Sequence, residues 1–336
     1  MTAKTSLVGA RLSVPPSVLR LLALALFAVA PFVLSTFRLS LLAEVLVYGT
    51  AAASLSLLLG FTGLPSLGHA AFFGLGAYTA GLLAVHVTDL AVIGLLLAVL
   101  LSAAVAAPTG WLATRTHGIF FLMLTLALGE IVHSVAISWS TLTGGTNGLA
   151  GIPAPGLVPG LNGSPWTAKT SYYYVLVAAV LAYVLLAAVL RSPFGHSLVG
   201  IRENEARMQA LGYKVARYKL ASFVLAAGVG GYAGALYAHS VRFVSPSLLD
   251  LESMVFLFVM PLLGGIRHLW GAIIGAGLVV FARHELTSRF DEWEFGLGVL
   301  LIVVVIASPE AWRQVVRRRS NRSDRSHQTA IEEVSS

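Results

Sequence analysis

The sequence predicts an all-α polytopic membrane protein with about ten transmembrane helices and with both termini in the cytoplasm. Hydrophobic residues make up 57% of its 336 residues and charged residues only 11%, whereas about a quarter of a typical soluble chain is charged. Since a membrane-spanning helix needs about 20 apolar residues, the length leaves room for roughly eight to eleven spans. The basic residues lie in short loops and near the termini, where they indicate orientation and do not suggest a nucleic-acid partner.

Apolar runs separated by polar or glycine-rich breaks predict where the individual membrane-spanning helices lie. The first run is interpreted as a retained helix because it lacks a convincing signal-peptide cleavage site. Gly230 and Gly234 have the GxxxG spacing of closely packed membrane helices. The predicted spans are 18–36, 40–60, 68–88, 90–112, 118–139, 172–190, 218–240, 252–264, 270–284 and 294–308.

The eighth and ninth spans, 252–264 and 270–284, are too short to cross a bilayer as ordinary independent helices. Gly264 and Gly265 separate them, so we expect a bent or re-entrant pair whose backbone is satisfied by neighbouring protein.

The distribution of basic residues predicts the orientation. With ten crossings and a cytoplasmic N-terminus, 17 Lys and Arg residues fall on the inside and 5 on the outside, as the positive-inside rule requires. Residues 1–312 are then a transmembrane domain, and the polar residues 313–336 are expected to be a disordered basic cytoplasmic tail in contact with lipid or solvent.

Motifs for catalysis, nucleotide binding and metal binding are missing from the sequence. It contains no GxxxxGK[ST], HExxH or GxSxG pattern, no clustered metal ligands and no cysteine. We therefore expect no catalytic residue, no metal and no cofactor on this chain. Any step powered by ATP would need its nucleotide on another chain.

The glycine-rich stretch Gly60–Tyr78 is the first candidate for the interior of the protein. Its glycines allow close helix approach or a break in a helix, and His69 is its only residue that titrates near neutral pH. Ser66, Gly68 and His69 are candidate pathway or core residues. Tight helix packing around a hydrogen-bonded imidazole is the more conservative interpretation.

Among the titratable residues inside predicted spans, three are candidates for a relay: Glu44 in the second span, and Glu130 and His133 three residues apart in the fifth. A carboxylate in the hydrocarbon region is costly, so we expect it to face the protein interior or a cavity. A proton or cation relay through these residues is one hypothesis, and interhelical hydrogen bonding is the alternative.

The segment 191–219 carries six basic and two acidic residues between two apolar spans. Leu198, Ile201, Met208 and Leu211 give one apolar face, so the spacing predicts a short amphipathic helix with Gly200 and Gly212 at its ends. Two glutamates within a basic set favour a protein partner over a lipid surface. The candidate contact residues are Gly200, Arg202, Glu203, Asn204, Glu205, Ala206, Ala210 and Gly212.

The predicted outer loop 141–171 is rich in Gly, Pro, Thr and Ser. It is too long for a simple connection, so we expect a compact lid or a docking surface, with a flexible solvent loop as the alternative. Its candidate residues are Thr143, Gly144, Gly145, Asn147 and Gly148.

Six motifs in order resemble one known family. They are GLPSLGHAAFFGLGAYTAGLL (63–83), TLALGEIV (125–132), LTGGTNGLAGIP (142–153), SPFGHSLVGIRENEARMQALGYKVARYKL (192–220), AGALYA (233–238) and GGIRHLWGAIIGA (264–276). Together they resemble the LivM-type permease subunit of branched-chain amino acid ABC importers over roughly residues 40–308.

The resemblance implies a permease of the type II ABC importer kind in the cell (inner or plasma) membrane. It also implies a LivH-type permease homologue as heterodimer partner, two cytoplasmic ATPase subunits, an extracytoplasmic substrate-binding protein and the lipid bilayer as partners. Residues 203–212 would be the coupling helix seated in a cleft of the ATPase. Urea, amides and other amino acids are carried by closely similar permeases, so the substrate stays open.

Two hypotheses therefore follow from the sequence. The first is a permease subunit of an ATP-driven importer for branched-chain or related amino acids, which makes and breaks no covalent bond itself. The alternative is a self-sufficient proton-coupled secondary transporter that uses Glu44, Glu130 and His133.

Overall fold

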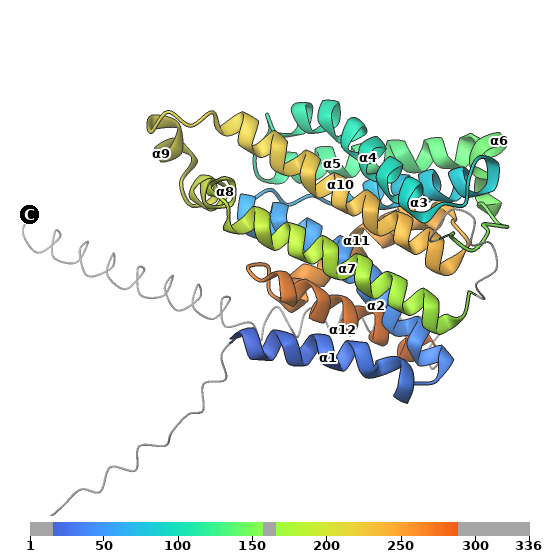
Figure 1. The fold of residues 1–336 in the computed structure, drawn as a ribbon. Helices are drawn as coiled ribbons and strands as arrows, with labels where there is room; N and C mark the ends of the chain where they lie inside the picture. Colours follow the sequence, from blue (N-terminus) through green and yellow to red (C-terminus); the bar gives the residue numbers. More distant parts are fainter. Residues whose placement is uncertain (1–15, 157–165, 288–336) are drawn as a thin grey trace, which may run out of the picture.

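The structure, a computed structural model, describes residues 16–156 and 166–287, and these form a bundle of helices whose long members run side by side between two ends (Figure 1). The described residues contain no β-strand, only two isolated bridges. The helical elements are α1 (Pro16–Val33), α2 (Thr36–Ser56), the π-helical turn η1 (Leu57–Thr62), α3 (His69–His86), α4 (Ala91–Ala113), α5 (Ile119–Ser138), α6 (Ser140–Thr143), the 3₁₀ turn η2 (Gly145–Asn147), α7 (Ala168–Arg191), α8 (Pro193–Glu203), α9 (Glu205–Ala210), α10 (Val215–Val241), the 3₁₀ turn η3 (Pro246–Leu249), α11 (Leu251–Gly264) and α12 (Leu269–Thr287).

Nine predicted apolar spans coincide with helices to within a few residues: α1 to α5, α7, α10, α11 and α12. The tenth predicted span, 294–308, lies outside the described residues, as does the predicted tail 313–336. Among the described helices, five are long and apolar enough to cross a membrane by length and composition, namely Thr36–Thr62, Ala91–Ala113, Ile119–Ser138, Ala168–Arg191 and Val215–Val241. The chain is thus a mostly helical polytopic membrane protein.

The two ends of the bundle carry different loops (Figure 1). The α9 end carries α8, α9, the α4–α5 turn and the α11–α12 turn. The α11–α12 turn contacts Gly60, and the Gly60 carbonyl accepts a hydrogen bond from Arg202 of α8. The α6 end carries α6, η2 and the segment that follows α10. The described basic residues at the α9 end are Arg115, Arg191, Arg202, Arg207, Lys214, Arg217, Lys219 and Arg267.

Helix α10 lies at the centre of the bundle and packs against α3 and α4 over its length. Its glycines let neighbouring backbones approach. A Cβ built on Gly234 would stand 1.8 Å from the carbonyl oxygen of Phe73, and one on Gly231 would stand 2.1 Å from Ser102 Oγ. The sequence prediction of close packing through this glycine run is confirmed.

We expect Gly234→Ala to prevent α3 and α10 from packing, because the backbone of Phe73 would have to move. Overpacking costs about 1–3 kcal/mol even where side chains can adjust, so a backbone clash should reach at least the top of that range. The matched control is Gly228→Ala in the same helix, where the nearest atom is a Val99 methyl at 3.4 Å. Size-exclusion profiles and melting temperatures in detergent check this. Equal melting of the two variants would contradict the packing.

The predicted pair of short helices at 252–264 and 270–284 is a hairpin of unequal arms. Helix α11 has 14 residues, about 21 Å at 1.5 Å per residue, as expected, but α12 has 19 residues and is longer than predicted. Gly265, with φ of +96°, forms the turn, and the backbones of Gly264 and Gly271 touch behind it. Because η3 contacts α3 near Gly74, α11 starts inside the bundle and not at its edge.

Candidate functional site

The charged segment between α7 and α10 folds as two helices, so the prediction of a single amphipathic helix bounded by Gly200 and Gly212 was wrong. Helix α8 runs through Gly200 and ends at Glu203, and the backbone of the next residue, Asn204, is extended (φ −158°, ψ 97°). The Asn204 side chain then caps α9 by accepting a hydrogen bond of 2.9 Å from the Arg207 amide. An asparagine that satisfies a free helical N–H favours this break. Gly212 does adopt the left-handed conformation expected after a helix.

Helix α8 fixes the segment to the bundle. Leu198 and Ile201 are buried, and the Arg202 guanidinium donates a hydrogen bond to the Gly60 carbonyl at the end of α2 and η1. Arg202 is therefore directed into the protein, not toward a partner. The contact links the segment between α7 and α10 to the glycine-rich stretch that precedes α3.

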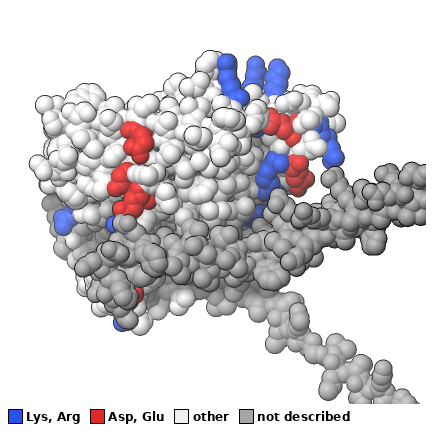
Figure 2. Space-filling model, turned by 180° about the vertical axis from the view of Figure 1, so that it is seen from behind, with Lys and Arg blue, Asp and Glu red and all other residues white. Residues whose placement is uncertain are grey.

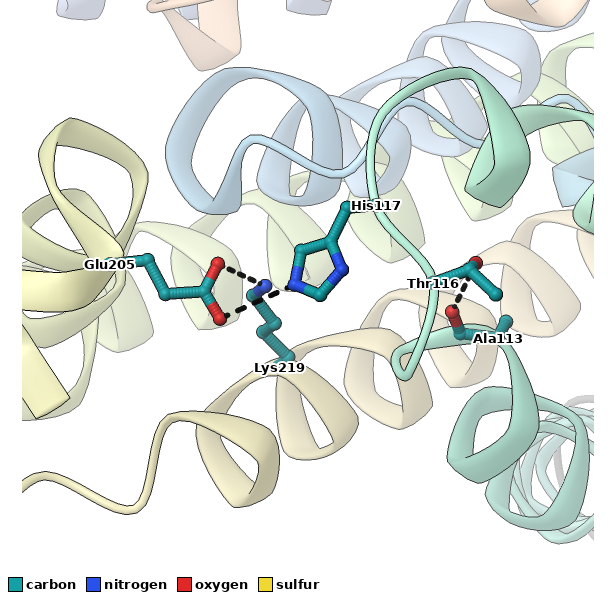
Figure 3. Close-up of polar contacts among 5 residues, drawn as sticks. All are labelled: Ala113, Thr116, His117, Glu205 and Lys219. Carbon is teal, nitrogen blue, oxygen red and sulfur yellow. Dashed lines mark hydrogen bonds and ion pairs between the residues drawn. The ribbon is translucent and has the colours of Figure 1, made fainter.

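Glu205 anchors α9 to two other elements (Figure 3). Its carboxylate lies 2.6 Å from Lys219 Nζ in α10 and 3.7 Å from His117 Nε2 in the α4–α5 turn. The Lys219 side chain is only 5% exposed, so Glu205 supplies the counter-charge of a buried ammonium. Glu205 thus makes ionic contacts within its own chain, and the sequence reasoning missed its partners Lys219 and His117.

The remaining surface of α9 is open, and α9 contains no buried residue. We call the exposed residues Glu203, Ala206, Arg207, Ala210 and Leu211 the α9 surface. Leu211 is 66% exposed. Lys and Arg side chains gather at one end of the molecule together with acidic ones (Figure 2). Small, apolar and charged side chains on a projecting helix form a surface suited to a protein partner.

The interior candidates Ser66, Gly68 and His69 are packed within the bundle. His69 Nε2 lies 2.7 Å from Ser54 Oγ in α2, and a Cβ on Gly68 would stand 2.0 Å from the Thr125 carbonyl oxygen. Both His69 and Ser66 are buried. This arrangement agrees with the conservative interpretation of a packed imidazole.

The candidate residues at the α6 end belong to an ordered turn. Thr143 Oγ1 donates to the Ala136 carbonyl at 2.6 Å and accepts from the Gly145 amide at 3.2 Å. Gly144, Gly145 and Gly148 all have positive φ. Leu149 pairs with Val244 as an isolated bridge, which ties the turn to the segment after α10. Asn147 and Gly144 are exposed. The part of the outer loop up to residue 156 is thus a compact cap.

Glu44 lines a cavity of about 510 Å³ at the α6 end, between α2, α7, α10 and α12. Its polar lining also includes Ser171, Tyr237, Arg242 and His284. No residue of α5 lines this cavity, so the structure does not bring Glu44 together there with the other two members of the hypothetical relay.

Glu130 and His133 lie on the outside of the described bundle. Glu130 Oε2 is 3.5 Å from His133 Nδ1, and the two side chains are 46% and 22% exposed. Within the described residues, Glu130 therefore faces outward and not into the interior of the bundle. A spacing of three residues correctly predicted one shared face, but it does not tell which face packs inward.

Comparison with known proteins places these features in a family. Residues 37–308 match the family described as the permease component of branched-chain amino acid transport systems. The chain belongs to this permease family. No group of three or more metal-ligating side chains occurs among the described residues, and the family's members are transport components.

Two curated relatives match this permease along most of its length. The high-affinity branched-chain amino acid transport system permease protein LivM of Salmonella typhimurium is 31% identical over 88% of this chain and 75% of its own. LivM of Escherichia coli has the same identity and coverage. A probable permease protein LivH of Methanocaldococcus jannaschii is 30% identical over 41% of this chain and 42% of its own. No solved structure matches this permease.

Proposed function

We propose that this permease is the membrane subunit of an ATP-driven importer for branched-chain or related amino acids. The α9 surface carries the proposal. It is an exposed helix at the basic end of the bundle, it is held from within by Glu205, and it leaves its small and apolar side chains free for a partner. A cytoplasmic ATPase that seats α9 in a cleft would account for these properties.

The orientation follows from the basic residues. Positive charge in short loops marks the cytoplasmic side, so the α9 end would face the cytoplasm and the α6 end the outside, with both termini cytoplasmic and ten crossings of the cell's inner membrane. The substrate-binding protein would then dock on the ordered cap formed by α6, η2 and residues 148–156.

In this mechanism the ATPases close on binding ATP and push α9. The Glu205 contacts would pass the movement to α10 and the start of α5, and the Arg202–Gly60 contact would pass it to the end of α2. The membrane helices would then alternate between outward-open and inward-open arrangements. This chain would bind no cofactor, and its contacts with the substrate would be weak and transient.

Reconstitution tests the proposal. Proteoliposomes are prepared with this chain, a LivH-type permease and two ATPases, and the binding protein is added outside. We expect labelled leucine uptake at least about tenfold above the level with ADP. Unlabelled isoleucine, valine, urea and a short amide, added as competitors, define the substrate. Uptake driven by a pH gradient, without ATP and without the ATPases, would contradict the proposal and favour the secondary transporter.

A further inference from the structure

A groove runs along α10 on the side of the bundle where α4 and α7 pack against that helix (Figure 1). It encloses about 760 Å³, with α10 as its floor and with residues of α4 and α7 as its walls. Small residues leave this space open: Ala221 and Gly228 on the floor, and Ala103 and Ala182 on the walls. We call it the α10 groove.

The α10 groove is long enough for an acyl chain. It follows α10 from Arg217 to Tyr232, which is roughly 22 Å at 1.5 Å per residue. The hydrocarbon core of a whole bilayer is about 30 Å thick, so the groove covers more than the depth of one leaflet. A lipid chain that enters at one end of the groove can therefore lie along the protein over its full length.

The described residues that line the α10 groove are apolar except at its two ends. At one end, the Tyr232 hydroxyl donates a hydrogen bond of 3.1 Å to the Ala178 carbonyl of α7, so its proton is already used. On the α7 wall, Leu181 and Leu185 are 61% and 50% exposed. Exposed leucines in the middle of a membrane-spanning helix suit hydrocarbon and not water. The interior of the groove therefore suits a lipid tail.

Arg217 gives the other end of the groove a positive charge. It is exposed, and no carboxylate among the described residues forms an ion pair with it, because Glu205 contacts Lys219 and His117 instead. Lys214, at the start of α10 three residues earlier, is also exposed. The positive charge at this end of the groove is thus left for a ligand to neutralise.

Arg217 also lies at the depth expected for lipid headgroups. It belongs to the first turn of α10, and the end of α4 lies beside it, since a Cβ on Gly110 would stand 3.1 Å from a Leu220 methyl. The next residue of α4, Trp111, is 54% exposed and carries the Arg115 guanidinium 3.7 Å from its ring centre. Exposed tryptophan and arginine at a helix end are typical of the membrane–water interface.

We propose that the α10 groove binds one anionic phospholipid, with the phosphate on Arg217 and one acyl chain along α10. Basic pockets between membrane-spanning helices suit acidic headgroups, and a guanidinium can donate two parallel hydrogen bonds to a phosphate. A zwitterionic lipid would bring its own ammonium group against Arg217 and Lys214. The site does not depend on what the permease transports. It lies beside Lys219, so the bound lipid stabilises the part of α10 that holds Glu205 of α9.

Native mass spectrometry of the full-length chain in detergent tests the headgroup. The probes are phosphatidylglycerol and phosphatidylethanolamine with identical palmitoyl and oleoyl chains. We expect the first phosphatidylglycerol to bind about fivefold more tightly than phosphatidylethanolamine, and Arg217→Gln to remove this preference. The control Arg207→Gln removes the same charge from exposed α9, outside the groove, and should keep the preference. Equal binding of the two lipids by the wild type, or an equal loss in both variants, would overturn the proposal.

Ala221→Phe tests the position of the acyl chain. Ala221 is exposed on the groove floor, one turn after Arg217, so a phenyl ring there would displace lipid methylenes. We expect both lipids to bind at least about fivefold more weakly. Ala107→Phe adds the same ring at an exposed position of α4 outside the groove and should change neither affinity. Equal lipid binding by the two variants would show that no acyl chain lies in the groove.

Photo-crosslinking identifies the occupant without filling the groove floor. A benzophenone amino acid replaces Leu185, which is half exposed on the α7 wall, and the chain is reconstituted in vesicles containing both lipids. We expect adducts with the mass of phosphatidylglycerol. Adducts with phosphatidylethanolamine in proportion to its abundance, with another segment of this chain or with a second protein would overturn the assignment.

Discussion

Glu205→Lys is expected to weaken strongly the packing of α9 against α10 and the α4–α5 turn. The substitution would place a second cation against Lys219, whose side chain is 5% exposed, and would remove the carboxylate that His117 contacts. Removing one partner of a buried ion pair costs about 3–5 kcal/mol. Because Glu205 itself is 31% exposed, we expect the lower end of that range. This corresponds to a fall in melting temperature of about 5 °C or more.

The matched control is Glu203→Lys, two residues away on the α9 surface and exposed. It should melt like the wild type. The charge-swapped double variant Glu205→Lys with Lys219→Glu should recover part of the loss, because it restores an ion pair between the same helices. Thermal unfolding in detergent measures all three. A Glu205→Lys variant as stable as Glu203→Lys would show that the ion pair is not part of the folded protein.

Ala206→Arg combined with Ala210→Arg is expected to abolish ATP-driven uptake while leaving the chain folded. Both alanines are exposed on α9 and lie four residues apart, so they share one face. Two long cationic side chains there would keep an ATPase cleft from closing on the helix. We expect uptake to fall at least about a hundredfold in proteoliposomes, with an unchanged melting temperature.

The control for this variant is Ala150→Arg, an exposed alanine at the α6 end. It adds the same side chain on the opposite side of the bundle and should keep normal ATPase association. It is a control for that association and not for uptake, because Ala150 lies on the proposed docking cap for the binding protein. Normal uptake by the α9 double variant would remove α9 from the coupling mechanism.

The helices of this fold could be predicted from the sequence because apolar runs of membrane length have few alternatives. The ranges for α2, α3, α4, α5, α7 and α10 were found to within a few residues. The break at Asn204 was not predicted, because the apolar spacing on either side of it fits one helix as well as two. Only the capping hydrogen bond to Arg207 decides between them.

The directions of the charged side chains could not be predicted. Glu203 and Glu205 are neighbours of the same type in sequence, yet one is exposed and the other neutralises Lys219 from α10. The sequence did offer one signal of this ion pair. Lys219 lies close to the start of a long apolar helix, where a lysine needs a counter-charge, and Glu205 precedes it by 14 residues. Glu130 shows the same limit, because whether a carboxylate faces the core or a partner depends on tertiary packing.

Co-purification of ATPase subunits with the tagged chain in mild detergent tests the central claim most directly. We predict that the wild-type chain and Ala150→Arg both retain the ATPases, and that Ala206→Arg with Ala210→Arg loses them while remaining monodisperse. Equal retention by all three would contradict the assignment of α9. A wild-type chain that purifies without ATPases and transports leucine alone would contradict the importer itself.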